Sequence, residues 1–272
     1  MKPTRRPAGR NRGLRRSPRI PPVIGAAEFA GRVAVVTGGS DGRGRDLVRA
    51  LVKLGADVFF CGRARKKGEV VARALGRRAH FILADLSDNA AARAFVKQAA
   101  AFKGRIDYLV NNAAIDPRIE FARATVADFD QLIAVNLRPF FVVAQAALPA
   151  LRRGTGRAIV NVATTNYLLG LAPFTLYNAS KSGIIGFTRS LARELGPRGS
   201  RGNTVSPGWI MTEKQRREHA TPRDRVELVK AQALKFLLTA EHVTPLTLFL
   251  LSRSAAGITG QNVVVDGGKF MQ

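Results

Sequence analysis

The chain has 272 residues, 46% of them hydrophobic, so it is long enough for one substantial α/β core and too short for two large domains. One cysteine, Cys61, excludes an internal disulfide, and three widely separated histidines offer no recognised metal-ligand spacing, so we expect no metal site. The formal net charge is +25, and no run approaches the roughly 18 apolar residues that span a bilayer.

The first 27 residues form a basic leader that differs in composition from the rest of the chain. It carries eight Lys and Arg residues, no acid before Glu28, and no apolar segment of the kind found in secretory signals. We predict that residues 1–27 are disordered, that residues 28–272 form the single domain, and that the protein is cytoplasmic. One interpretation of the charge is contact with nucleic acid through counterion release. No zinc finger, RNA-recognition signature or helix-turn-helix accompanies it, so we expect no specific nucleic-acid partner and no membrane association.

From residue 32 onward, short apolar runs alternate with longer amphipathic runs. The short runs predict strands at 33–37, 58–61, 79–84, 106–111, 157–163, 200–205 and 261–265. The longer runs predict helices at 43–54, 88–103, 125–150 with a kink at Pro139, 174–196 and 222–251. This alternation indicates an α/β fold, a doubly wound, Rossmann-type parallel sheet of about seven strands covered on both faces. On such a sheet, ligands bind beyond the carboxyl ends of the strands.

A glycine-rich turn lies between the first predicted strand and the first predicted helix. Its sequence, Thr37-Gly38-Gly39-Ser40-Asp41-Gly42-Arg43-Gly44, has the spacing T-G-x-x-x-G-x-G. Glycines let the backbone turn tightly and approach a pyrophosphate at a helix N-terminus, which favours dinucleotide binding over an ordinary strand-to-helix turn. The candidate cofactor-binding residues of this turn are Gly38, Ser40, Asp41, Gly42, Arg43 and Gly44.

The segment Tyr177-Asn178-Ala179-Ser180-Lys181 is the strongest catalytic candidate. A spacing of four puts Tyr177 and Lys181 on one face of the predicted helix. A tyrosine titrates near 10, but an adjacent ammonium and a positively charged oxidised nicotinamide both favour the phenolate. The pair is therefore suited to general-base catalysis at neutral pH.

These two motifs resemble those of the short-chain dehydrogenase/reductase family, and the resemblance extends over residues 30–268. Further similar segments are Asp85-Leu86, Asn111-Asn112-Ala113-Ala114 with Ala where Gly is usual, Pro207-Gly208 with Thr212, Thr259-Gly260-Gln261 and Val265-Asp266-Gly267-Gly268. The resemblance implies an oxidoreductase that moves a hydride between NAD(P) and an alcohol or carbonyl carbon of a small-molecule substrate. It adds to the cofactor site Asp85, Leu86, Asn112, Ala113, Pro207, Gly208, Ile210 and Thr212, with Tyr177 and Lys181. It also implies a homotetramer or a dimer, because the helices near 125–150 and 174–196 pack between subunits in this family.

The same resemblance implies a role for each catalytic candidate. Thr164, thirteen residues before Tyr177, stands where the family has a serine and would orient the substrate oxygen. Thr165, the next residue, is the alternative candidate if the spacing to the tyrosine is twelve residues here. Tyr177 would be the general base, and Lys181 would hold the nicotinamide ribose and lower the tyrosine pKa. Asn136 matches an asparagine that holds a water between the lysine and solvent.

Two features bear on the choice of cofactor. Arg43 replaces the isoleucine usual between the last two glycines of the turn, and we interpret it as a pyrophosphate contact, the alternative being weakened cofactor binding. The second predicted strand ends at Gly62-Arg63 with no acid to repel a 2′-phosphate, and Arg63 could clamp one, so NADP is favoured over NAD. Asp41 favours NAD, because NADP-dependent members often carry a base there.

The substrate is the least determined feature. Three stretches resemble the aldose 1-dehydrogenases within the family and suit a sugar or another polyhydroxy substrate. They are Asp116-Pro117-Arg118, Leu168-Leu169-Gly170-Leu171, and Thr212-Glu213-Lys214-Gln215 with Thr221-Pro222. A 3-oxoacyl or other ketone reductase is the first alternative, since the fold does not dictate the substrate. A non-catalytic NAD(P)-binding sensor is the second, kept open by Arg43, Thr164 and Gly202, where the family usually has other residues.

Overall fold

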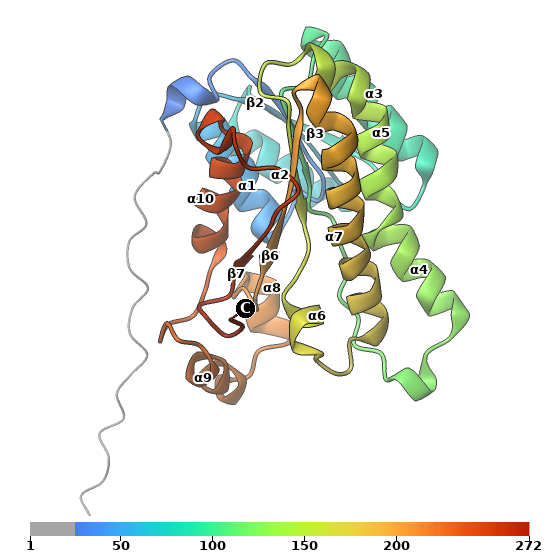
Figure 1. Ribbon diagram of the computed structural model, residues 1–272, viewed down its shortest axis with the longest axis vertical. Coiled ribbons are helices and arrows are strands. Elements are labelled where there is room, and N and C mark those ends of the chain that lie inside the picture. The colour runs from blue at the N-terminus through green and yellow to red at the C-terminus, as the bar shows by residue number, and fades with distance from the viewer. Residues whose placement is uncertain (1–24, 272) are drawn as a thin grey trace, which may run out of the picture.

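Seven parallel strands form the centre of the fold in the computed structural model, which describes residues 25–271 (Figure 1). The strands are β1 Val33–Val36, β2 Asp57–Gly62, β3 Ala79–Leu83, β4 Tyr108–Asn111, β5 Ala158–Val162, β6 Arg201–Pro207 and β7 Asn262–Val265. Their order in the sheet is β3-β2-β1-β4-β5-β6-β7, and every neighbouring pair is parallel. The predicted doubly wound sheet is confirmed, and its order reverses between β1 and β4, where such sheets bind their ligands.

Helices cover both faces of the sheet (Figure 1). One face carries α1 Gly42–Lys53, α2 Arg65–Leu75 and α10 Ala240–Leu251. The other carries α3 Asn89–Lys103, α4 Val126–Asn136, α5 Arg138–Arg153 and α7 Thr175–Leu195. Shorter helices, α6 Asn166–Leu169, α8 Glu213–Glu218 and α9 Pro222–Ala231, lie beyond the carboxyl ends of the strands, at the bottom of the view.

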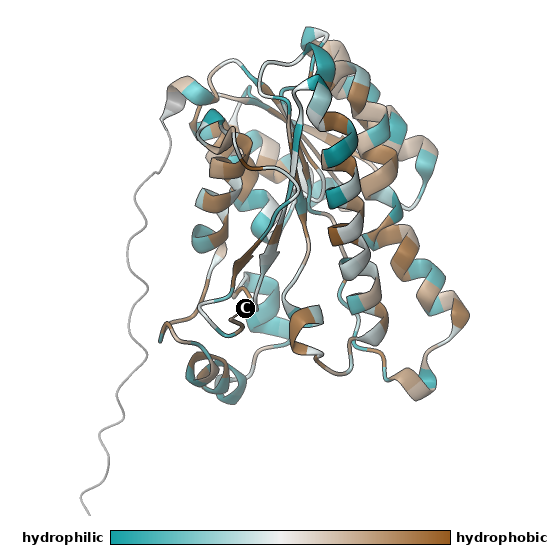
Figure 2. Ribbon diagram, in the orientation of Figure 1, coloured by the Kyte–Doolittle hydropathy of each residue, from teal (hydrophilic) through white to brown (hydrophobic). Residues whose placement is uncertain are grey.

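The central strand β1 supplies apolar side chains to both layers. Ala34 and Val36 belong to one buried cluster with Leu47 and Leu51 of α1, whereas its alternate residues pack with α3 and α5. Successive side chains of a strand point to opposite faces, so a strand covered on both sides has to be apolar throughout. Figure 2 shows this pattern as hydrophobic strands between helices of mixed polarity.

The stretch Val126–Arg153 is long and apolar enough to cross a membrane, judged by length and composition alone. In this fold it comprises α4 and α5, and Val142, Val143, Ala147 and Leu151 are buried in the cluster shared with α3. Packing in the core therefore accounts for much of its apolar character.

The helix predicted at 125–150 is two helices. α4 ends at Asn136 and α5 begins at Arg138, with Leu137 between them outside helical geometry. Pro139 occupies the first turn of α5, where its missing N–H does not interrupt a helical hydrogen bond. Pro139 thus starts a new helix, whereas we expected it to kink a continuous one.

The helical region predicted at 222–251 is also interrupted. α9 ends at Ala231, α10 begins at Ala240, and the Gln232 side chain donates hydrogen bonds to the carbonyls of Leu234 and Phe236 in the connecting loop. These short-range side-chain contacts hold the chain in a loop conformation between the two helices. Helices α6 and α8 were not predicted either, because four and six residues are too few to establish a helical period.

The predicted disordered leader lies mostly outside the described residues, which begin at Gly25. Its last two residues belong to a short 3-10 helix, Ala26–Glu28, and the Glu28 carboxylate accepts a hydrogen bond of 2.9 Å from the backbone N–H of Arg253. This hydrogen bond connects the start of the predicted domain to the segment after α10.

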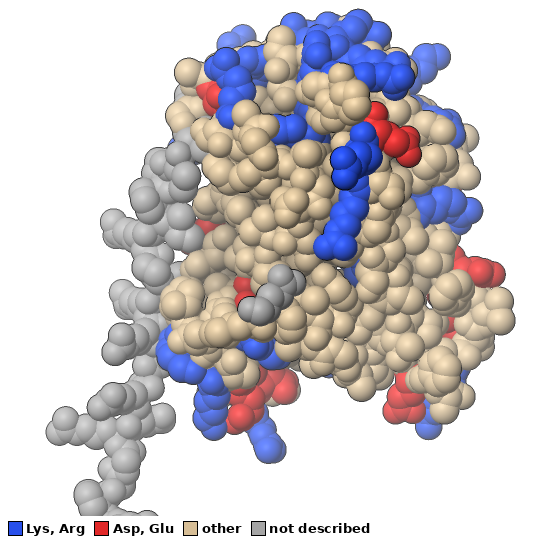
Figure 3. Space-filling view, in the orientation of Figure 1, with Lys and Arg blue, Asp and Glu red and all other residues tan. Residues whose placement is uncertain are grey.

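Basic side chains gather at the end of the molecule where the strands begin, at the top of the view in Figure 3. Arg152 and Arg153 at the end of α5 and Arg198 after α7 are exposed there. This charge lies opposite the carboxyl ends of the strands.

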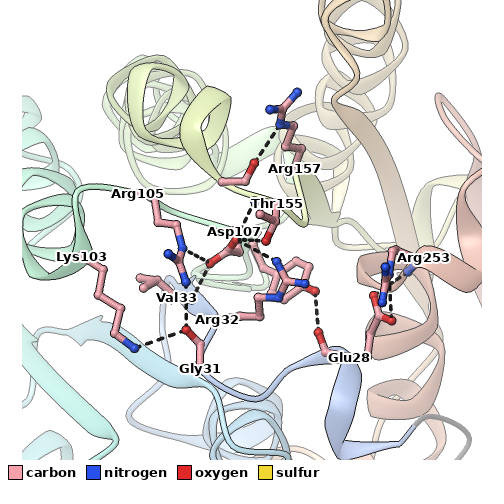
Figure 4. Close-up of polar contacts among 12 residues, drawn as sticks. Glu28, Gly31, Arg32, Val33, Lys103, Arg105, Asp107, Thr155, Arg157 and Arg253 are labelled. Carbon is pink, nitrogen blue, oxygen red and sulfur yellow. Dashed lines mark hydrogen bonds and ion pairs between the residues drawn. The ribbon is translucent and has the colours of Figure 1, made fainter.

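At the same end, the buried carboxylate of Asp107 joins three segments (Figure 4). It accepts hydrogen bonds from the backbone N–H of Val33 (2.8 Å) and from the N–H and hydroxyl of Thr155 (2.7 and 2.8 Å). Arg105 donates a further hydrogen bond of 3.2 Å, and Arg32 lies 3.6 Å away. Burial alone would raise the pKa of Asp107, but these hydrogen bonds hold the pKa below its ordinary value.

Candidate active site

A cavity of about 710 Å³ opens at the carboxyl ends of the strands. It is lined by the loops that follow β1 to β6 and by the first turn of α7. All of the predicted site residues line it except three, which are Asn136, Lys181 and Pro207.

 

The glycine turn after β1 is shaped to hold a ligand closely. Gly38 has a positive φ of 67°, and a Cβ there would lie 2.9 Å from the Cα of Ala113. A Cβ on Gly44 would collide with the Gly38 carbonyl oxygen, so neither position tolerates a side chain. Asp41 caps α1 by accepting a hydrogen bond of 2.8 Å from Gly42 N–H. The turn and the helix N-terminus behind it therefore fit a pyrophosphate.

The segment after β4 is fastened to this turn by Thr37. The Thr37 hydroxyl accepts hydrogen bonds from the N–H groups of Asn112 (2.8 Å) and Ala113 (3.1 Å). The Asn112 amide in turn donates to the carbonyls of Thr37 and Gly38, at 3.0 and 3.2 Å. Asn112 and Ala113 are thus held at the cavity wall, and Thr37 is a supporting residue that we did not single out from the sequence.

The outer part of the cavity is lined by residues after β2 and β3. Arg63 is exposed there, and Lys67 of α2 forms an ion pair with Asp41. The pair gives Asp41 a cationic neighbour that the sequence could not assign, because it depends on how α2 approaches the glycine turn. Asp85 accepts hydrogen bonds from the Ser87 N–H and hydroxyl, which lower the pKa of Asp85.

Tyr177 and Thr164 lie together at the inner part of the cavity. Both are more than nine-tenths buried and line the same cavity. Burial raises the pKa of Tyr177 to about 12, against the opposing effects of the Arg43 charge and the neighbouring Thr164 side chain. Thr165 is directed elsewhere, since its N–H and hydroxyl both contact the Pro207 carbonyl.

Lys181 lies behind Tyr177 on the same face of α7 and is fully buried. Its ammonium donates a hydrogen bond of 2.9 Å to the Val162 carbonyl and lies 5.5 Å from the centre of the Phe140 ring. Burial, followed by the Arg43 charge, lowers the pKa of Lys181 to about 7. Lys181 is therefore hydrogen-bonded to the backbone of β5 and does not line the cavity.

Asn136 ends α4 and is also fully buried. Its amide oxygen accepts a hydrogen bond of 2.8 Å from Ile115 N–H, and its amide nitrogen donates to the Ile115 carbonyl at 2.9 Å. The same nitrogen lies 3.3 Å from the Ser180 hydroxyl. Asn136 therefore fastens the loop after β4 to α7, next to the Tyr177–Lys181 pair.

The rim of the cavity is formed by the loop after β4 and by α8. Asp116 accepts a hydrogen bond of 3.0 Å from the Gln215 amide and lies 3.7 Å from the Lys214 ammonium. The Trp209 ring N–H donates to Gln215 at 2.7 Å. These contacts join two segments nearly one hundred residues apart, and no sequence motif indicates the role of Trp209.

A cavity lined by a tyrosine and a threonine, with a lysine buried behind the tyrosine on the same helix, is the arrangement expected of a nicotinamide-dependent oxidoreductase. The profile of the family described as "Enoyl-(Acyl carrier protein) reductase" matches residues 38–269. The chain therefore belongs to the short-chain dehydrogenase/reductase family, as the motifs predicted. No group of three or more His, Cys, Asp or Glu side chains that could hold a metal occurs in the described part of the chain.

Several known proteins are similar to this chain over nearly their full length. A "Probable galactose dehydrogenase GalD" of Rhizobium meliloti is 40% identical, with 88% of this chain and 95% of that protein covered. A "D-xylose 1-dehydrogenase" of Caulobacter vibrioides is 36% identical with the same coverage. A "3-oxoacyl-[acyl-carrier-protein] reductase FabG" of Chlamydia pneumoniae is 33% identical, with 88% and 97% covered.

Solved structures agree on the fold. A "Short-chain dehydrogenase/reductase SDR:Glucose/ribitol dehydrogenase" from Brucella melitensis superposes with a TM-score of 0.85 at 32% identity, covering 90% of this chain and 99% of that one. A "blue fluorescent protein from metagenomic library in complex with NADPH" superposes with a TM-score of 0.83 at 35% identity, covering 90% and 100%.

Proposed function

We propose that this oxidoreductase oxidises a sugar or another polyhydroxy alcohol, with NADP preferred over NAD. The observation that carries the proposal is that buried Thr164 and Tyr177 line the same cavity, whose rim is polar. A hydroxyl-rich substrate requires such a rim, because each buried hydroxyl must find a hydrogen-bond partner.

A nicotinamide bound in the cavity supplies the hydride acceptor. Tyr177 takes the proton of the substrate hydroxyl at its own oxygen, and Thr164 orients the substrate oxygen. Lys181 would favour the phenolate and would hold the nicotinamide ribose once its ammonium is released from the Val162 carbonyl. Asn136 supports the return of the proton to solvent. Its hydrogen bond to Ser180 keeps the end of α4 next to Lys181. Reduction of a carbonyl runs the same steps in reverse.

Replacing Thr164 by Val is expected to lower kcat/KM about 100-fold, because the shape is kept while the hydroxyl that orients the substrate oxygen is lost. Thr164→Ser keeps the hydroxyl and is the matched control, expected to stay within about threefold of the parent. Steady-state kinetics with saturating cofactor measures both. Equal activity in the Val and Ser variants would remove Thr164 from the reaction.

Preference for NADP is supported by Arg63 and Lys67 at the outer end of the cavity. Arg63→Ala is expected to lower kcat/KM for NADP about tenfold and to leave NAD nearly unchanged, because only NADP carries the phosphate that Arg63 binds. Arg65→Ala is the matched control, since Arg65 is exposed and pairs with Glu69. An equal loss with both cofactors would contradict the assignment of Arg63 to the 2′-phosphate.

The relatives named for galactose and xylose support the sugar substrate, and the FabG relative supports the alternative of a 3-oxoacyl reductase. The direct test is a panel of D-galactose, D-xylose, xylitol and 2-butanol for oxidation, and a 3-oxoacyl thioester for reduction, each with both cofactors. Turnover highest on an aldose would support the proposal. Turnover confined to the thioester would support the alternative, and cofactor binding without turnover would favour the sensor.

We infer a cytoplasmic homo-oligomer, a tetramer or a dimer. The inference is supported by exposed apolar residues gathered on and before α4 and α5, namely Phe121, Val126, Phe129 and Phe141. Burying such side chains against another subunit would remove apolar surface from water. Light scattering of the purified protein distinguishes these states from a monomer.

A further inference from the structure

The guanidinium of Arg43 has no ionic partner among the described residues. Arg43, in the first turn of α1, lines the same cavity as Thr164 and Tyr177. Among residues 25–271, its guanidinium makes neither a hydrogen bond nor an ion pair, whereas Lys67 and Lys214 in the same lining each pair with a carboxylate. Burying a charge without a partner costs desolvation free energy. A negatively charged neighbouring group or ligand offsets that cost.

The charged groups around Tyr177 come from three segments. Arg43 acts on it from α1 and Asp116 from the loop after β4, and Lys181 lies on the same helix as Tyr177. Arg118 lies 5.7 Å from the Phe174 ring, which packs against the Tyr177 ring at 5.9 Å. Asp116 opposes the phenolate, but it is shared with Lys214. Arg43 is therefore the cation that acts on Tyr177 from the side of the cofactor turn.

Arg43 differs from Lys181 in being charged at every pH of interest. Lys181 is fully buried and donates a hydrogen bond to the Val162 carbonyl, and burial lowers its pKa. The guanidinium of Arg43 supplies a positive charge that does not titrate with the reaction. Such a charge near a phenol favours its ionised form.

We propose that Arg43 is a positioning residue whose unpaired guanidinium, in the wall of the cavity, stabilises the phenolate of Tyr177. The proposal rests on the proposed role of Tyr177 as the general base. Removing the charge disfavours the phenolate, so the base becomes available only at higher pH. In oxidation the acid limb of the pH profile then moves upward, and in reduction the alkaline limb moves upward by the same amount.

The test is the pH profile of kcat/KM at saturating cofactor, with the substrate turned over fastest in the panel above. Arg43→Ile and Arg43→Gln are expected to move the limb assigned to Tyr177 upward by about one pH unit, and Arg43→Lys is expected to restore it. Arg49→Gln, on the same helix with an exposed side chain paired to Asp46, is the matched control and is expected to leave the limb in place. Two uncharged variants allow for one that does not fold.

An unshifted limb in folded, active Arg43 variants would overturn the proposal. A fluorescence titration of NADPH binding then shows whether Arg43 is a pyrophosphate contact instead, in which case binding weakens at least about tenfold in both uncharged variants. Failure of the proposed function is separate, because it is seen as activity that survives in Tyr177→Phe. That outcome would remove Tyr177 as the base whatever the Arg43 variants do.

Discussion

Replacing Tyr177 by Phe is expected to lower kcat/KM by at least about 1,000-fold, near the upper end of what a general acid–base group contributes. The change removes only the phenol oxygen, and the ring can keep its packing against Phe174. Thr164 then faces the substrate oxygen alone, and a hydroxyl group cannot act as a base at neutral pH. Steady-state rates with the best substrate of the panel measure the loss.

The control for this experiment is Tyr108→Phe. Tyr108 is buried in β4, and its hydroxyl donates to the Glu28 carbonyl at the opposite end of the sheet. This variant loses a phenol oxygen outside the cavity, so its activity is expected to stay within about twofold of the parent when it is folded. NADPH affinity and thermal stability of Tyr177→Phe should resemble those of the parent. Activity within tenfold of the parent in Tyr177→Phe would contradict the mechanism.

Replacing Asp107 by Ala is expected to destabilise the protein by about 3–5 kcal/mol, the range found when one partner of a buried ion pair is removed. The substitution leaves the N–H groups of Val33 and Thr155 and the cations of Arg32 and Arg105 without their acceptor (Figure 4). Urea unfolding measures the change. Asp130→Ala, an exposed residue on α4, is the control and is expected to stay within about 0.5 kcal/mol.

Asp107 also makes stability depend on pH. Its pKa is lower in the folded protein than in the unfolded chain, where an aspartate titrates near 3.9. The stabilisation is therefore complete above about pH 4 and is lost as the pH falls through the folded pKa. Asp107→Asn should show a weaker fall in stability below pH 4 than the parent. An identical acid dependence in both proteins would show that Asp107 does not contribute.

Sequence and structure agree most closely where a local pattern carries the information. The apolar strands, the glycine turn after β1 and the four-residue spacing of Tyr177 and Lys181 each follow from backbone periodicity and side-chain size. The local helical pattern was misleading in two places. Around Leu137, a proline in the first turn of α5 starts a new helix. In 232–239, the Gln232 side chain bonds to the loop between α9 and α10.

The sequence by itself determined the fold class, the family and the identity of the chemical groups at the site, because these depend on periodicity and on the residues that the motifs contain. Only the tertiary structure decided the partners of those groups. It turned Lys181 toward the Val162 carbonyl, paired Asp41 with Lys67, joined Asp116 to α8, and left Arg43 unpaired beside Tyr177. These contacts join residues far apart in the chain, and their energies depend on distance and burial, which local sequence patterns do not encode.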